Sequence, residues 1–372
     1  MPAHVRDDAG RKAISLYMGP SPLVPNGDDL EAAVVRFIDG AKRSLDIAVQ
    51  ELESVPIAEA ILRAKNDRGV RVRIVLESDY LRETTKLKIE DKWKPVPIDA
   101  RSRGNEPNRE VFSALLRSRL DVRTDYNANI FHQKFIVRDK NRKTAALLTG
   151  STNFTPTGVA NNLNHVIIVY DNEVAKDYDR EFREIWRGEF GRRPVRTNDR
   201  PREHRVAGVR VKPLFAPEHS PEMEVMKQVL KTRERLDFAI FTFSNSSGID
   251  DTLLSLDAWD VTVRGILDGS QGRQSWAPTH ELAALPNFEM YLSPKRGQLG
   301  KLHHKLMVID DNVVIGGSFN YTGAANRFND ENILVIGDVD ESDPVAAHNQ
   351  AVLGRYARHG VDQIIDEFGI AV

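Results

Sequence analysis

The chain has 372 residues, enough for about two domains, and 41% of them are hydrophobic, which allows a substantial core. A formal net charge of −2 excludes a polycation, so a polyanion must be bound by a local basic patch. The absence of cysteine excludes disulfides, thiolate nucleophiles and Cys-based zinc sites. The first residues lack the apolar segment of a signal peptide, and no apolar run of about 18 residues occurs, so we expect a cytoplasmic protein without a spanning helix.

Two pairs of segments recur at one constant spacing of 191 residues (236 − 45 and 261 − 70). Their β-branched residues predict four strands: Ser44–Gln50, Val70–Leu76, Arg235–Phe241 and Val261–Leu267. The stretches beside them predict helices over 28–41, 57–67 and 221–234. Repeated strand–helix–strand units predict an α/β fold of two similar lobes, each a mixed or parallel sheet flanked by helices.

This repeat divides the chain into an N-terminal lobe over 1–190, a linker over 191–212 and a C-terminal lobe over 213–372. The first half carries 20 extra residues (191 − 171), which we place in a surface insertion at about 82–108. The basic residues of the insertion are Lys86, Lys88, Lys92, Lys94, Arg101 and Arg103. The linker has eight basic residues against Asp199 and Glu203, a local charge of +6. Both segments are either solvated loops or a lid and a phosphate-binding patch near the active site.

Each half then contains the pattern H-x-K-x4-D, followed within about twenty residues by G-S-x-N. The first copy has His132, Lys134, Asp139, Ser151 and Asn153, and the second has His303, Lys305, Asp310, Ser318 and Asn320. Residues i and i+2 of a strand point to the same side, so each histidine should share a side with its lysine. Gln133 and His304 should point the other way. The G-S-x-N segments offer hydroxyl and carboxamide groups that suit phosphate oxygens, so we predict that Ser151 and Ser318 bind substrate.

Two imidazoles, two ammonium groups and two carboxamides that converge on one anion suit a two-step displacement at phosphorus. One histidine attacks and forms a phosphohistidine, and the other protonates the leaving oxygen and then activates water. Lysines and asparagines stabilise the non-bridging oxygens, so we expect neither a metal nor a cofactor.

The duplicated motif resembles the signature of the phospholipase D superfamily, and the resemblance covers most of the chain. It implies a two-lobed α/β fold with the active site at the lobe interface and a covalent phosphohistidine intermediate. The residues that it implies as catalytic are His132, Lys134, Asn153, His303, Lys305 and Asn320. The resemblance implies a structural role for Asp139 and Asp310.

Members of this superfamily commonly place a carboxylate at the position of Glu331 to hold the histidine, whereas Asn164 occupies the matching position of the first half. A carboxylate raises the pKa of an imidazole, so we predict Glu331 behind a protonated His303 that acts as general acid. His132 would then be the neutral nucleophile. A different partner for His132, supplied across the interface, also stays open.

The segments 317–322 and 329–332 resemble the branch that holds the endonuclease Nuc, the Zucchini nucleases and a proposed cardiolipin hydrolase. We therefore favour a nucleic acid slightly over a phospholipid headgroup, with phosphatidyl transfer as a third possibility. Aromatic residues beside the motifs either stack bases or pack in the core: Phe131, Phe154, Phe319 and Tyr321. Trp93, Trp259 and Trp276 are candidates for peripheral membrane contact. One chain supplies both motifs, so a monomer is sufficient for catalysis.

Overall fold

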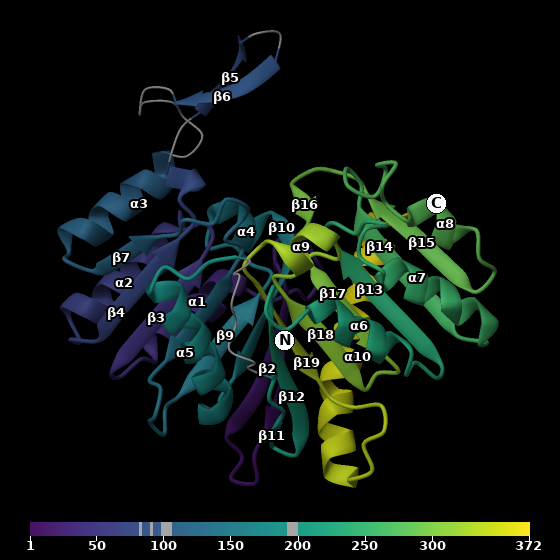
Figure 1. The fold of residues 1–372 in the computed structure, drawn as a ribbon. Coiled ribbons are helices and arrows are strands. Elements are labelled where there is room, and N and C mark those ends of the chain that lie inside the picture. The colour runs from purple at the N-terminus through teal and green to yellow at the C-terminus, as the bar shows by residue number, and fades with distance from the viewer. Residues whose placement is uncertain (82–83, 90–91, 98–105, 192–199) are drawn as a thin grey trace.

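The computed structural model describes residues 1–81, 84–89, 92–97, 106–191 and 200–372, which form two lobes built on one sheet each (Figure 1). The N-terminal sheet runs β1 (Ala3–Arg6), β2 (Lys12–Gly19), β10 (Asn162–Val169), β9 (Ala146–Gly150), β8 (Lys134–Arg138), β3 (Ser44–Val49), β4 (Arg71–Leu76) and β7 (Asp121–Thr124). Within it β3, β4 and β7 are parallel to one another, and the other neighbours are antiparallel.

The C-terminal sheet repeats this order. It runs β11 (His204–Val206), β12 (Val209–Ala216), β19 (Glu331–Ile336), β18 (Val313–Gly317), β17 (Lys305–Ile309), β13 (Arg235–Ile240), β14 (Thr262–Asp268), β15 (Phe288–Ser293) and β20 (Ile370–Ala371). A short strand of this half, β16 (Lys301–Leu302), pairs in parallel with β10 and so joins the N-terminal sheet. The predicted fold of two similar α/β lobes with mixed sheets is confirmed.

The helices of the first half are α1 (Leu30–Asp39), α2 (Val55–Asn66), η1 (Asp79–Leu81), α3 (Glu106–Arg117), α4 (Pro156–Ala160) and α5 (Asn172–Trp186). Those of the second half are α6 (Pro221–Val229), α7 (Ile249–Leu254), η2 (Ser255–Ala258), α8 (Thr279–Ala283), α9 (Gly323–Arg327) and α10 (Pro344–Phe368). The three helices predicted over 28–41, 57–67 and 221–234 correspond to α1, α2 and α6, and the other helices were not predicted. The helix predicted over 28–41 begins at Leu30, because the Asp29 side chain accepts a hydrogen bond from the Ala32 N–H and caps it.

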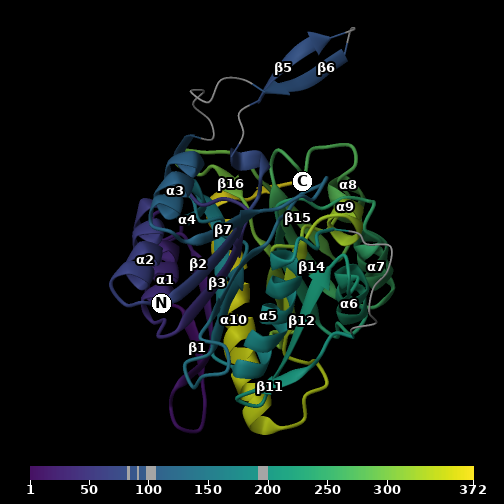
Figure 2. The same ribbon diagram turned by 60° about the vertical axis from the view of Figure 1, so that its left-hand side comes forward.

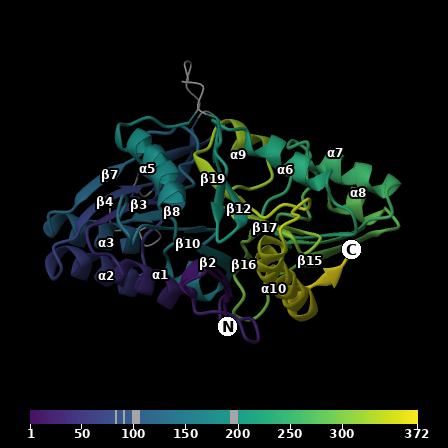
Figure 3. The same cartoon turned by 90° about the horizontal axis from the view of Figure 1, so that it is seen from below.

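The two lobes share a central core in addition to an outer core of their own. The shared cluster joins residues of both sheets, for example Phe135 and Ile167 with Phe215 and Leu306. The last helix of each half also reaches across: α5 packs on β12, and α10 packs on β1 and β2 (Figure 3). Because burial of apolar surface drives association, this shared core fixes the two motif strands in one arrangement.

The predicted insertion lies partly in the described residues. There β5 (Thr84–Ile89) and β6 (Lys92–Pro97) form a two-stranded antiparallel sheet that stands away from both lobes (Figure 2). We predicted an irregular segment. The strands escaped notice because the segment is rich in charged residues and contains Pro95 and Pro97, which are unusual within strands. Arg101 and Arg103 lie outside the described residues.

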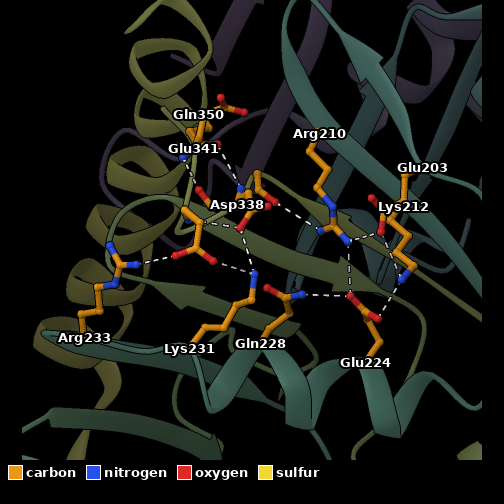
Figure 4. A network of polar contacts seen from close by, with 12 residues as sticks. Glu203, Arg210, Lys212, Glu224, Gln228, Lys231, Arg233, Asp338, Glu341 and Gln350 are labelled. Atoms are coloured by element: carbon orange, nitrogen blue, oxygen red, sulfur yellow. Dashed lines mark hydrogen bonds and ion pairs between the residues drawn. The ribbon is translucent and has the colours of Figure 1, made fainter. Parts of the chain in front are cut away.

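The predicted linker does not hold for residues 204–212, which form β11 and the first half of β12. Arg210 donates to Glu203 at 2.6 Å and Lys212 to Glu224 at 2.8 Å, within the polar network of Figure 4. Arg205 is paired with Glu341. These cations are already neutralised, so they do not support a phosphate-binding patch; residues 192–199 lie outside the described residues.

None of the helices in the described ranges combines the length and the apolar character that crossing a bilayer requires.

The two motif aspartates end their strands in the left-handed backbone conformation, with φ of 51° at Asp139 and 50° at Asp310. The Asp139 carboxylate accepts hydrogen bonds from the backbone N–H groups of Lys42, Arg43 and Ser44. Asp310 accepts the equivalent bonds from residues 233–235. Each carboxylate therefore ties the end of its motif strand to the start of β3 or β13, in agreement with a structural role.

We expect Asp139→Asn to lower the free energy of unfolding by about 1–3 kcal/mol, because an amide replaces a charged acceptor. Burial alone would raise the pKa of Asp139, but hydrogen bonds from Ser44, Thr144, Lys42 and Arg43 hold it below 3.8. A lowered pKa gives stability that is present above the unfolded value and is lost as pH falls through the folded one. The difference from wild type in urea unfolding should therefore shrink in acid below about pH 3.8, while Asp8→Asn, on an exposed turn, should change little at any pH.

Candidate active site

One cavity of about 510 Å³ lies between the lobes, where α4, α9 and β16 come together in Figure 1. Its walls include both motif histidines and both G-S-x-N asparagines, His132, His303, Asn153 and Asn320. The remaining lining is mostly capable of hydrogen bonding: Gln50, Glu51, Tyr80, Asn129, Thr155, Thr157, Asn162, Thr242, Lys301, Thr322 and Asn329. The cavity is therefore a polar site to which both lobes contribute.

The alternation predicted for the H-x-K segments is present, although β8 and β17 begin only at the lysines. Lys134 and Lys305 lie buried beneath the cavity, and each Nζ donates to the backbone oxygen of its own histidine, at 3.0 Å and 2.9 Å. Gln133 and His304, which lie between each histidine and its lysine, point to the opposite side of the strand and contact residues of the other lobe. Asn332 donates to Gln133 at 2.6 Å, and His304 stacks on His165 with ring centroids 5.4 Å apart.

The two histidine rings lie in a T-shaped arrangement with their planes 74° apart and their centroids 6.5 Å apart, which leaves room for one phosphorus atom between them. Their partners are crossed between the lobes. His132 Nδ1 lies 2.7 Å from Glu331 Oε2, and His303 Nδ1 lies 3.0 Å from Asn164 Oδ1. The prediction that Glu331 stands behind His303 is wrong, and the partner of His132 comes across the interface.

The sheet order explains the exchange. Strand β18 separates β19, which begins at Glu331, from β17, which follows His303. Strands are about 4.8 Å apart, so two strand spacings put about 9.6 Å between these positions, too far for a hydrogen bond. Packing of the lobes instead brings the start of each such strand to the histidine of the other lobe.

Both partners are held in turn by the G-S-x-N serines. Ser318 Oγ donates to Glu331 Oε2 at 2.7 Å, and Ser151 Oγ donates to Asn164 Oδ1 at 2.8 Å. Both serines are fully buried, and neither lines the cavity. The structure therefore does not support the predicted substrate-binding role of Ser151 and Ser318, which instead position the histidine partners.

The motif glycines, Gly150 and Gly317, allow the strand ends that carry the two serines to lie against the neighbouring strands. A Cβ on Gly150 would meet the His165 carbonyl oxygen at 2.2 Å, and one on Gly317 would meet that of Asn332 at 2.2 Å. Only glycine allows the end of β9 or β18 to approach its neighbour this closely.

The hydrogen bonds also fix the tautomers. A carboxylate accepts only, so His132 donates from Nδ1 to Glu331. The Asn164 amide donates to the Gly158 carbonyl at 2.8 Å, which leaves its oxygen to accept from His303 Nδ1. In the neutral rings, Nε2 therefore carries the free lone pair.

Burial governs the charge of the site. It lowers the pKa of His132 to about 4, although Glu331 acts to raise it. It holds the pKa of His303 well below the ordinary value, and Lys305 and Lys134 act in the same direction. Burial also lowers the pKa of Lys134 to about 7, against the opposing effect of Glu331. A bound phosphodiester anion would raise the pKa of these histidines and of Lys134 and so favour their protonated, positively charged forms. The site therefore suits an anion.

The asparagines are less symmetric than their motifs. Asn153 donates from Nδ2 to Glu51 at 2.8 Å, and its oxygen is buried without a partner in the described residues. Asn320 accepts from the Thr242 N–H at 3.3 Å, which leaves both of its amide hydrogens for a substrate.

Several cavity residues were missed by the sequence analysis, among them Gln50, Glu51, Tyr80, Phe241 and Lys301. Gln50 and Phe241 directly follow the equivalent strands β3 and β13, and the repeat itself was the signal that could have found them. Gln50 accepts from Lys134 Nζ at 3.0 Å. The aromatic residues proposed for base stacking are buried in the core instead: Phe131, Phe154, Phe319 and Tyr321.

Comparison with known proteins decides the family. The family model described as "Cardiolipin synthase, PLD-like domain" matches residues 34–186 and 225–352, which include both H-x-K motifs. The chain belongs to the phospholipase D-like family. Members of this family are enzymes that cleave or transfer phosphodiesters.

Curated relatives of this phospholipase D-like protein are similar over about half of its length or less. A phospholipase D of Rickettsia bellii is 32% identical over 151 residues, 41% of this chain and 71% of that protein. The human mitochondrial cardiolipin hydrolase is 27% identical over 163 residues, 44% of this chain and 53% of that protein. The chain thus spans about half the length of the human relative.

A solved structure has the same fold over nearly the whole chain. The phosphatidylserine synthase of Haemophilus influenzae superposes with a TM-score of 0.64 at 12% identity, over 96% of this chain and 87% of that one. At this identity the likeness concerns the fold alone.

Proposed function

We propose that this protein hydrolyses phosphodiester bonds through a covalent phosphohistidine, with His132 as nucleophile and His303 as general acid and base. The observation that carries the proposal is the crossed and unequal pairing of the two histidines, His132 with a carboxylate and His303 with a carboxamide.

Attack through Nε2 makes the His132 ring a cation, since Nδ1 keeps its proton. The Glu331 carboxylate at 2.7 Å neutralises that cation, which an amide cannot do. The neutral Asn164 stabilises a protonated His303 much less than a carboxylate would. A bound substrate anion favours protonation of His303, and the protonated ring then gives its proton readily to the leaving oxygen. His132 and His303 keep the roles that we predicted from the sequence. The reason differs, because the Glu331 carboxylate lies beside the nucleophile His132 and not beside the acid His303.

In the first step a bond forms between His132 Nε2 and phosphorus, the bond to the leaving oxygen breaks, and the His303 proton passes to that oxygen. In the second step water attacks phosphorus, neutral His303 takes its proton, and the P–N bond breaks with return of the electron pair to His132. Lys134, Lys305, Asn153 and Asn320 would stabilise the non-bridging oxygens throughout.

For the substrate we favour a single strand of nucleic acid. The cavity walls are mostly polar, and Lys301 and Phe241 add a cation and an aromatic ring. Grooves for single strands combine these two features, one for the backbone and one for the bases.

The second candidate is a phospholipid headgroup, and a specific surface favours it. Tyr126, Ile130 and Phe328 are 82%, 44% and 38% exposed, and Asn127 donates to the Phe328 carbonyl at 3.2 Å. Ile130 also lines the cavity, so these side chains could enter a lipid interface beside its mouth. The names of the human and Rickettsia relatives agree with this candidate.

The direct test offers the protein single-stranded DNA, RNA, duplex DNA, phosphatidylcholine and cardiolipin, each with and without EDTA. Because the proposed mechanism assigns the stabilisation of the non-bridging oxygens to two lysines and two asparagines, we expect unchanged rates in EDTA. Loss of all activity in EDTA that returns with a divalent cation would contradict the metal-independent mechanism. Release of headgroups without any cut in a nucleic acid would select the lipid candidate.

A further inference from the structure

Most of the cavity lining consists of eight pairs of equivalent positions of the two lobes, and four of these pairs carry the same residue. The identical pairs are His132 and His303, Asn153 and Asn320, Thr155 and Thr322, and Asn162 and Asn329. The histidines are separated by 171 residues (303 − 132), and the other pairs by 167 (320 − 153). A phosphoryl group between the histidines thus meets similar groups on both sides.

Four pairs of equivalent positions break this symmetry, and one of them is Thr157 of the first lobe with Ala324 of the second. Gln50 and Glu51 of the first lobe correspond to Phe241 and Thr242 of the second, and Ile130 corresponds to Lys301. The two ester arms of a phosphodiester are the part of the substrate that differs from one side to the other. The positions that differ between the lobes are therefore the ones that can distinguish the arms.

The aromatic position lies on the side of the general acid. The Phe241 ring centroid is 5.0 Å from that of His303, and Lys301 Nζ is 5.5 Å from the Phe241 centroid. Phe241 is half-buried and is anchored by its backbone N–H, which donates to the His304 carbonyl at 2.8 Å. Lys301 is exposed, so its long side chain can leave the ring when a ligand arrives.

The opposite side has a different chemistry. Glu51 accepts a hydrogen bond from Asn153, and Tyr80 Oη accepts one from Gln50 at 3.3 Å. The aromatic ring on this side, that of Tyr80, is held through its hydroxyl by Gln50 and lies beside the Glu51 carboxylate, whose charge repels a neighbouring phosphate.

We propose that Phe241 and Lys301 form the leaving-group subsite and that it recognises a nucleoside, with the base stacked on Phe241 and the following phosphate paired with Lys301. The inference rests on the proposed function, because only the leaving arm lies beside the acid, His303. A cationic headgroup would be repelled by Lys301, and a glycerol moiety would give the ring no flat partner. Base–aromatic stacking tolerates all four bases, so the subsite requires an unpaired strand rather than a sequence.

The test compares dinucleotides that carry a terminal phosphate with analogues in which one nucleoside is abasic. Both isomers, abasic on the 5′ or on the 3′ side, are measured, and the readout is the ratio of kcat/KM with and without the base. For the isomer that lacks the base of the leaving nucleoside, the wild-type enzyme should show a ratio of kcat/KM with the base to kcat/KM without it of about ten or more. Phe241→Ala should reduce this ratio to near one. Phe241→Trp should retain the ratio, and so should Trp259→Ala, which removes an exposed aromatic residue outside the cavity lining. Lys301→Gln should lower kcat/KM only for substrates with the terminal phosphate.

The outcomes separate the inference from the function on which it rests. Dinucleotide cleavage with a base-to-abasic ratio that Phe241→Ala leaves unchanged overturns the subsite alone. Hydrolysis of phospholipids but of no nucleotide substrate overturns the subsite and the nucleic acid together. Failure to hydrolyse any phosphodiester overturns the proposed function itself.

Discussion

With a p-nitrophenyl phosphodiester, the His303→Ala variant should release about one equivalent of p-nitrophenolate in a burst and then nearly stop. This leaving group needs no proton, so His132 can still attack, whereas the water that must follow has lost its base. The enzyme should accumulate an adduct on His132, detected by mass spectrometry of peptides kept at neutral or alkaline pH. On an alkyl or nucleoside ester, the same variant should lose about 10⁴-fold in kcat/KM, because neither step is assisted.

The His132→Ala variant should show no burst with any substrate, since the phosphorus finds no nucleophile. The matched control is His348→Ala, an exposed histidine of α10, which should keep the wild-type rate. Thermal unfolding of all three variants shows whether they are folded. A burst in His132→Ala with an adduct on His303 would reverse the two roles, and folded variants that both turn over normally would remove the shared site.

The duplication explains why so much of the fold could be predicted. A constant spacing between similar strands means that one supersecondary unit occurs twice, and the structure has the same order of β2, β10, β9, β8, β3 and β4 as of β12, β19, β18, β17, β13 and β14. The two-residue period likewise predicted which side of the strand His132 and Lys134 share. Both inferences depend on local geometry, which the sequence encodes directly.

The partner of each histidine depends on contacts between the lobes. Glu331 follows His303 closely in the chain, and this proximity suggested a pair. The order β17, β18, β19 places one strand between them, and that separation could have been deduced from the antiparallel hairpins that the motif predicts. Which residue then meets Glu331 depends on the shared core, and no local pattern specifies it.

The buried serines show the same limit. A hydroxyl in a G-S-x-N segment suits a phosphate, but the strand end turns Ser151 and Ser318 toward their neighbouring strands. The cavity residues Glu51 and Phe241 belong to no sequence motif. They line the cavity only because they lie at strand ends between the two lobes.

The last prediction tests the unequal partners. Glu331→Gln keeps an acceptor for His132 Nδ1 but removes the charge that neutralises the phosphorylated ring. We expect the burst rate with the p-nitrophenyl ester to fall about 10- to 100-fold, the value of a charge-assisted hydrogen bond of about 1.5–3 kcal/mol. This loss should appear with every leaving group, since attack by His132 begins every reaction.

Asn164→Asp is the matched change on the other side, and it places a carboxylate behind His303. The burst with the p-nitrophenyl ester should stay close to wild type, because no acid is needed there. With an alkyl or nucleoside leaving group the rate should fall, since a carboxylate raises the pKa of His303 and weakens it as an acid. The alkaline limb of the pH profile should move to higher pH, because a raised pKa keeps His303 protonated, and therefore able to act as the acid, up to a higher pH. If Glu331→Gln instead spared the p-nitrophenyl burst and Asn164→Asp abolished it, His303 would be the nucleophile, and the carboxylate would serve the acid.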